Sequence, residues 1–346
     1  MSALASAPKT SFGLDRARRH PVVGLVVVLV ALAITAVLSL AVGARSIAPG
    51  TVLHVLFSPD GSDASTVIHQ LRVPRTMVAL GAGLCLGAAG ALMQGHTRNP
   101  LAEPGLLGVS SGASLAVVLG ITLLHVTSPA GYAWFALVGA GAAAVAVFAI
   151  GSGRRGPDAV SLVLAGAAVS ALLSAFTQAV ILRDEQTLDA YRFWAVGSVA
   201  GRDMDVFWQV LPFMVVGLVV ALFNTRALNL LQLGEETAVS LGIHPLVHRI
   251  VGVAAVMLLT GAATAACGPI GFVGLVVPHV ARALAGVDYR WVLPYSALIG
   301  ALLLLAADII GRVIARPAEV QVGIVMALVG GPVFIYIVRH IRTIRI

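Results

Sequence analysis

Residues 22–43 read VVGLVVVLVALAITAVLSLAVG, an apolar run of 22 residues that is long enough to cross the hydrocarbon core of a bilayer as a helix. Similar runs recur along the whole 346-residue chain, in which 59% of the residues are hydrophobic and only 11% are charged. Within lipid, the backbone polar groups of such runs must hydrogen-bond internally, which favours helices. The sequence therefore predicts an all-α polytopic membrane protein.

We expect about ten transmembrane helices. The candidate spans lie at 22–43, 73–93, 105–125, 132–151, 159–182, 206–223, 249–268, 271–286, 292–311 and 320–338. The eighth span is the weakest of these, because it is short and contains Pro278 and Arg282. Cys85 and Cys267 both fall inside apolar spans, where we interpret them as small core residues and expect no disulfide.

The orientation follows from the distribution of positive charge. Residues 1–20 contain four Lys or Arg residues ahead of the first span, and that span is too long for a cleaved signal peptide. By the positive-inside rule we expect 1–20 to be a cytoplasmic tail, 21–346 to form the transmembrane domain, and both termini to be cytoplasmic. Several arginines cluster on the predicted outer side instead. These are Arg72, Arg75, Arg312 and Arg316.

Two interpretations of the outer arginines are open. They meet an acidic partner outside the membrane, or they reach lipid headgroups and pair within the chain with Asp308 and Glu319. Asp308 and Arg312 are four residues apart on one predicted helix, so they are able to pair.

A polar segment, GEETAVSLG at residues 234–242, lies between two long apolar blocks. Glu235, Glu236 and Ser240 fall on one side of a two-turn helix, Ala238 and Leu241 fall on the other, and the closing glycine is suited to end it. A helix this short is unstable alone in water. We therefore expect it to fold against a partner surface outside the membrane.

The sequence disfavours several other functions. The only lysine, Lys9, follows no glycine-rich loop, so the chain lacks a Walker A site and any ATP hydrolysis belongs to another subunit. Ion-coupled carriers usually place carboxylates in mid-membrane, whereas only Asp308 lies in an apolar span here. An ion-coupled secondary transporter is the alternative from a different class.

Two short motifs give only weak indications of a catalytic site or a metal site. Residues 108–112 match the G-x-S-x-G pattern of serine hydrolases, but they lack the strand–turn–helix context and favour helix packing through small residues. His244 and His248 are four residues apart without an evident third ligand, which favours a solvated loop pair. We expect neither a catalytic residue nor a metal site in this chain.

Several longer motifs closely resemble the permeases of ABC importers for iron siderophores, haem and cobalamin. The motifs are LRVPRT at 71–76, GALMQ at 90–94, RNPLAEPGLLGVSSGA at 98–113, FWAVGS at 193–198, LGEE at 233–236, GFVGLVVPH at 271–279, AAD at 306–308 and VG at 322–323. The resemblance covers nearly the whole chain beyond the tail. Residues 192–203 are most similar to the ferric-enterobactin branch.

We expect the second half to repeat the first in inverted orientation, as transporter folds often do, because both halves carry a Pro- and Gly-broken segment, 99–112 and 268–279. The resemblance implies a ten-helix permease domain over 21–346. It implies a second permease subunit, identical or homologous, two cytoplasmic ATPase subunits that bind ATP and Mg, and a periplasmic or lipid-anchored substrate-binding protein. This chain would bind no cofactor and no nucleic acid, and would lie in a bacterial cell membrane. The expected substrate is a ferric siderophore, with haem and cobalamin as alternatives.

The resemblance also assigns residues to roles. The coupling helices, at about 226–248, would contact the ATPase through Gly234, Glu235, Glu236, Ala238 and Gly242. The binding protein would dock on Arg72, Arg75, Arg312 and Arg316. The polar side chains of the spans add candidates for the translocation path, and the resemblance makes the segment around 191–198 its outer gate. The candidates for path and gate are Ser170, Ser174, Gln178, Arg192, Trp194 and His279.

Overall fold

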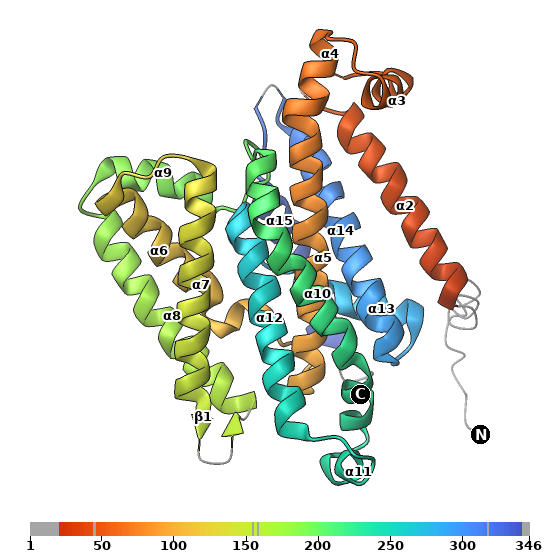
Figure 1. The fold of residues 1–346 in the computed structure, drawn as a ribbon, viewed down its shortest axis with the longest axis vertical. Helices are drawn as coiled ribbons and strands as arrows, with labels where there is room; N and C mark the ends of the chain where they lie inside the picture. Colours follow the sequence, from red (N-terminus) through yellow and green to blue (C-terminus); the bar gives the residue numbers. More distant parts are fainter. Residues whose placement is uncertain (1–20, 44–45, 154–155, 158, 317, 341–346) are drawn as a thin grey trace, which may run out of the picture.

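The structure, a computed structural model, describes residues 21–43, 46–153, 156–157, 159–316 and 318–340; the predicted tail 1–20 lies outside this part. In the described chain, eight helices are long and apolar enough to cross a membrane, and two further apolar helices are shorter. These correspond one to one to the ten predicted spans. The all-α polytopic class is thereby confirmed, and the protein is membrane-embedded (Figure 1).

The helices of the ten spans are α2 (Pro21–Ala41), α5 (Val73–Thr97), α6 (Val109–Leu124), α7 (Pro129–Gly151), α8 (Ala159–Ile181), α10 (Met204–Gln232), α12 (Pro245–Cys267), α13 (Val273–Ala285), α14 (Tyr289–Ile314) and α15 (Val322–His340). The connecting elements are α3 (Pro49–Phe57), α4 (Asp63–Thr66), the π-helix η1 (Val67–Arg72), the 3₁₀-helix η2 (Pro104–Leu107), α9 (Glu185–Ala195) and α11 (Glu235–Ser240). Two-residue antiparallel strands, β1 (Ser152–Gly153) and β2 (Gly156–Pro157), join α7 to α8.

Two helices extend well beyond their predicted bounds. The second spanning helix is continuous from Asp63 rather than beginning near Pro74, because the π turn of η1 rearranges the backbone hydrogen bonds just before the proline. Helix α10 continues beyond the predicted end at residue 223 to Gln232. This extension carries polar residues toward α11.

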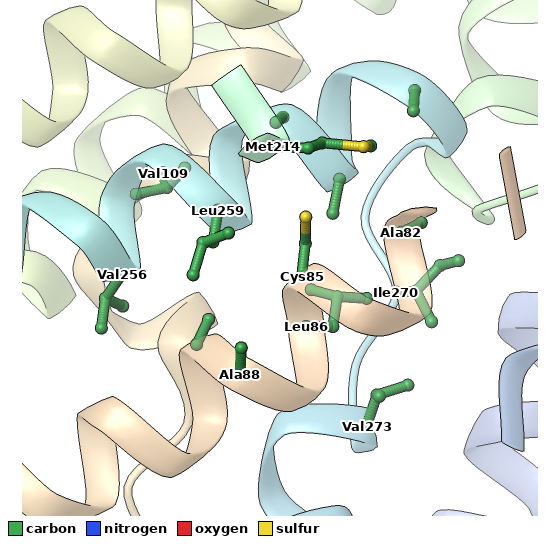
Figure 2. Close-up of a cluster of buried hydrophobic side chains, with 14 of the residues drawn as sticks. Ala82, Cys85, Leu86, Ala88, Val109, Met214, Val256, Leu259, Ile270 and Val273 are labelled. Atoms are coloured by element: carbon green, nitrogen blue, oxygen red, sulfur yellow. The ribbon is translucent and has the colours of Figure 1, made fainter. Parts of the chain in front are cut away.

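Helix α5 is the centre of the bundle and packs against α10, α12, α13 and α14. Figure 2 shows Cys85 and Leu86 of α5 meeting side chains of the neighbouring segments, including Leu259 of α12 and Met214 of α10. Small residues bring the backbones together. A Cβ at Gly87 would lie 2.0 Å from the Ser296 carbonyl oxygen of α14.

The two halves of the chain repeat one pattern in opposite orientations. Helices α5–α8 and α12–α15 each contain a short second helix, and each short helix follows a residue in the left-handed region, Gly108 (φ 75°) before α6 and Phe272 (φ 67°) before α13. Helix α5 begins at the end of the bundle that carries α4, whereas α12 begins at the end that carries α11 (Figure 1). This is the predicted inverted repeat.

The G-x-S-x-G segment serves helix packing. A Cβ at Gly112 would lie 2.4 Å from the carbonyl oxygen of Gly139, which places α6 in backbone contact with α7. Ser110 lies in the first turn of α6 after a 3₁₀ turn, without the preceding strand that a nucleophile elbow requires. The packing interpretation is therefore confirmed.

Candidate functional site

The predicted coupling segment forms α11 at the end of the bundle opposite α3 and α4 (Figure 1). The flanking glycines adopt positive φ angles, 109° at Gly234 and 81° at Gly242. The Gly242 N–H donates to the Val239 carbonyl at 3.0 Å, and the Ile243 N–H donates to the Ala238 carbonyl at 2.9 Å. The helix therefore ends at the predicted glycine.

The surface of α11 combines a buried anchor with exposed apolar and charged groups. Ala238 is fully buried, whereas Val239 and Leu241 are 57% and 54% exposed, so Leu241 does not share the buried side as predicted. Glu235 pairs with Arg249 of α12, while Glu236 is exposed. Exposed apolar residues on a polar connecting segment are typical of a contact surface for another protein.

Asn224 forms a polar junction under α11 that the sequence did not reveal. Its Nδ2 lies 3.0 Å from His96 Nε2 and donates to the His248 carbonyl at 3.1 Å, and its Oδ1 lies 3.2 Å from His248 Nδ1. The junction ties α5, α10 and α12 together. His248 is thus half-buried and bound within the bundle rather than a member of a solvated pair with His244.

At the opposite end, the outer arginines form an ion-pair cluster around Asp308. This carboxylate lies 2.8 Å from Arg75 and 2.8 Å from Arg312, and Arg75 also lies 2.7 Å from Glu319. The side chains of Asp308 and Arg312 are each 2% exposed. The predicted pairing of Asp308 with Arg312 is confirmed.

Two of the four outer arginines fasten the end of α2. Arg72 donates to the carbonyls of Leu40 and Ala41 at 2.6 and 2.9 Å, and Arg312 donates to those of Ser39 and Val42, both at 2.8 Å. Arg72 and Arg312 are only 6% and 2% exposed in this structure, and their assignment as docking residues stays a prediction. Arg75 is 13% exposed and Arg316 is exposed.

The gate candidates on α9 differ from one another. Arg192 is 58% exposed, pairs with Asp189 at 3.1 Å, and stacks over the Phe193 ring at 5.0 Å. Trp194 is only 2% exposed and packs beside Gly268, so it anchors α9 in the core and does not line an open path.

The next connection, between α9 and α10, buries Arg202. Burial lowers the pKa of Arg202, although a guanidinium remains protonated at physiological pH. Its Nε donates to the Ser198 carbonyl at 3.4 Å, so Arg202 is held against its own connecting segment.

The remaining path candidates lie on two helices. On α8, Ser174 and Gln178 are exposed and Ser170 is half-buried, a spacing that places the three on one helical face. His279 of α13 is instead held within the chain, with Nε2 2.9 Å from the Pro100 carbonyl oxygen. His279 therefore joins the two halves in this structure, and its role in the path, like that of the α8 face, stays a prediction.

The two broken segments meet each other in the centre of the molecule. Glu103 accepts a hydrogen bond from the Phe272 N–H at 2.7 Å, at the start of α13. A cavity of about 220 Å³ beside this contact is also lined by Ser110 and Thr264. The sequence indicated only a loop carboxylate at Glu103, because its partner is 169 residues away.

We expect Glu103→Ala to lower the stability of the protein by about 2 kcal/mol, since it removes a half-buried, charge-assisted hydrogen bond to the Phe272 amide. Thermal unfolding of the detergent-purified protein measures the change. Glu103→Gln keeps an acceptor oxygen at this position and should recover much of the loss. Equal stability of the alanine variant and the wild type would refute this role.

Comparisons with known proteins agree with this architecture. The model of the FecCD transport family matches residues 31–340. The probable siderophore transport system permease YfiZ of Bacillus subtilis is 43% identical over 290 residues, covering 84% of this chain and 87% of that protein. The ferric enterobactin transport system permease FepD of Escherichia coli is 43% identical over 325 residues, covering 93% and 96% respectively.

A solved structure described as a metal-chelate type ABC transporter in an inward-facing conformation is also similar. It superposes with a TM-score of 0.81 at 29% identity and covers 92% of this chain and 99% of that one. Family, relatives and structure all extend over both halves of the inverted repeat. The chain belongs to the FecCD transport family.

Proposed function

We propose that this chain is the membrane permease of a binding-protein-dependent ABC importer that carries a ferric siderophore into the cytoplasm. The family match over residues 31–340 carries the proposal, together with two relatives at 43% identity whose names specify siderophore or ferric enterobactin transport. The chain itself catalyses no reaction in this proposal. The energy for transport comes from ATP, which binds together with Mg to a separate subunit.

Two ATPase subunits would dock at the α11 end, where exposed Val239 and Leu241 lie beside Glu236. A second permease subunit, identical or homologous, would complete the path along the exposed face of α8 that carries Ser174 and Gln178. The substrate-binding protein would dock at the other end, where Arg316 is exposed and Arg75 is 13% exposed. No nucleic acid takes part.

This arrangement sets the orientation in the bacterial cell membrane. In this proposal the α11 end faces the cytoplasm, and the end with α3, α4 and α9 faces outward (Figure 1). Both termini are then cytoplasmic, as the charge pattern of the sequence predicts. Most arginines of the sequence fall in segments that are predicted to be cytoplasmic, which agrees with the positive-inside rule. The binding protein is periplasmic or lipid-anchored accordingly.

An ion-coupled carrier fits the structure less well. Such carriers require a carboxylate that gains and loses its ion in mid-membrane. The carboxylate of Asp308 is instead held between two arginines at 2.8 Å each, near the end of α14. Co-purification of an ATPase subunit with this chain distinguishes the two classes directly.

We expect Glu236→Arg to reduce binding-protein-stimulated ATP hydrolysis by the reconstituted complex about tenfold. The exposed Glu236 lies in the first turn of α11, and a reversed charge would repel a partner surface that had been complementary to it. Gly141→Ala, in an open position on α7, is the control for membrane insertion. Unchanged hydrolysis by the Glu236 variant would count against α11 as the coupling site.

A further inference from the structure

Two arginines without an acidic partner lie near α11. Arg226 belongs to the extension of α10, and Arg290 belongs to the first turn of α14. Both are exposed, and neither takes part in an ion pair within the described chain. At the other end of the molecule, by contrast, Arg75 and Arg312 are paired with acids.

The two arginines line the same cleft. Its volume is about 310 Å³, and its lining is completed by Asn229, Leu230 and Leu241. Leu241 directly follows α11 and is 54% exposed, so the cleft opens beside the proposed coupling surface. Three chain segments thus contribute to a single basic cleft.

The walls of this cleft are held by hydrogen bonds in which neither guanidinium group takes part. Asn229 donates to the Asp288 carboxylate at 2.6 Å and accepts from the Tyr289 N–H at 2.9 Å. Asp288 also caps α14 through the Arg290 N–H at 2.9 Å. Contacts within the chain therefore hold the cleft open before a ligand binds, and the guanidinium groups of Arg226 and Arg290 are available to that ligand.

The two guanidinium groups suit the cleft to an anionic ligand such as a carboxylate. Guanidinium groups remain protonated at physiological pH and bind carboxylates through paired, charge-assisted hydrogen bonds. Along the surface, exposed Glu236 is followed by apolar Val239 and Leu241 and then by the basic cleft. This order of negative, apolar and positive groups would determine which protein surface binds here and in which position it binds.

We propose that the cleft between Arg226 and Arg290 binds an acidic segment of the ATPase subunit, as a second docking contact beside α11. The inference rests on the proposed function, because it requires an ATPase partner. A lipid headgroup would satisfy the two arginines but would not use the exposed apolar residues between the cleft and Glu236. The continuity of the cleft with that apolar surface therefore favours a protein segment.

The test is association of the purified ATPase subunit with the permease variant R226E/R290E in phosphatidylcholine nanodiscs at low salt. We expect the affinity to fall at least about tenfold, since two charge contacts become repulsive. The matched control is R339E, which reverses an exposed arginine on α15 outside the cleft and should bind as the wild type does. An acid-to-arginine substitution in the ATPase that restores binding to R226E/R290E would identify the occupant.

Two results would overturn the proposal. One is wild-type affinity of R226E/R290E for the ATPase. The other is a defect confined to nanodiscs that contain phosphatidylglycerol, which would assign the cleft to an anionic lipid headgroup. Failure of the wild-type permease to bind any ATPase would instead contradict the proposed function itself, so the two failures are distinguishable.

Discussion

Replacing Asp308 by Asn is expected to remove most of the folded protein from the membrane. The carboxylate pairs with both Arg75 and Arg312, and the side chain of Arg312 is only 2% exposed. Loss of one member of a buried ion pair leaves an uncompensated charge and costs about 3–5 kcal/mol. Because Arg312 also holds the carbonyls of Ser39 and Val42, the end of α2 should loosen at the same time.

The amount of monodisperse protein after detergent extraction measures this loss, and thermal unfolding of the remainder gives its size. Glu319→Gln is the matched control, because Glu319 contacts Arg75 from a side chain that is 35% exposed. Surface ion pairs of this kind contribute about 1 kcal/mol or less. Wild-type yield and stability of the Asp308 variant would show that the cluster does not hold the outer end together.

The second large effect is expected from Gly87→Ala in the centre of α5. The added Cβ would lie 2.0 Å from the Ser296 carbonyl oxygen, and a backbone atom within a packed helix cannot move aside as a side-chain end can. The added methyl group would push α5 away from α14 and so disrupt the packing between these two helices. We expect a loss of about 3 kcal/mol, at the upper end of the usual cost of overpacking.

Thermal unfolding in detergent tests this prediction against Gly141→Ala on α7, where an added Cβ meets no atom within 4 Å. The control substitution should leave stability equal or slightly higher, since alanine favours a helix interior over glycine. A Gly87 variant as stable as the control would mean that α5 and α14 can separate without cost.

The sequence predicts the spanning helices well because membrane insertion is governed by local apolar length. Each of the ten expected spans has a helix, and the short α11 ends at Ser240, with the predicted Gly242 in the left-handed region just beyond it. The bounds of α10 could not be predicted, because its final turns are polar and are held by tertiary contacts, including the bond from Arg98 to the Leu231 carbonyl at 2.5 Å.

The candidate site was harder to predict than the fold. Charge pattern alone could not decide whether Arg72 and Arg312 face outward, since their partners are carbonyls of α2 more than 30 residues away in the chain. Trp194 and His279 lie in motifs of the family, yet both are structural contacts in this chain. Residues that act through long-range contacts, such as Asn224 and Glu103, carry no local signal in a single sequence.

The central claim is that this chain imports a ferric siderophore. Its most direct test is uptake of iron-labelled siderophores, and separately of labelled cobalamin and haem, in cells that lack the gene, with and without a plasmid copy. We predict the selective loss of one ferric siderophore, restored by the plasmid. Unchanged uptake of every ferric siderophore together with loss of cobalamin or haem uptake would contradict the claim.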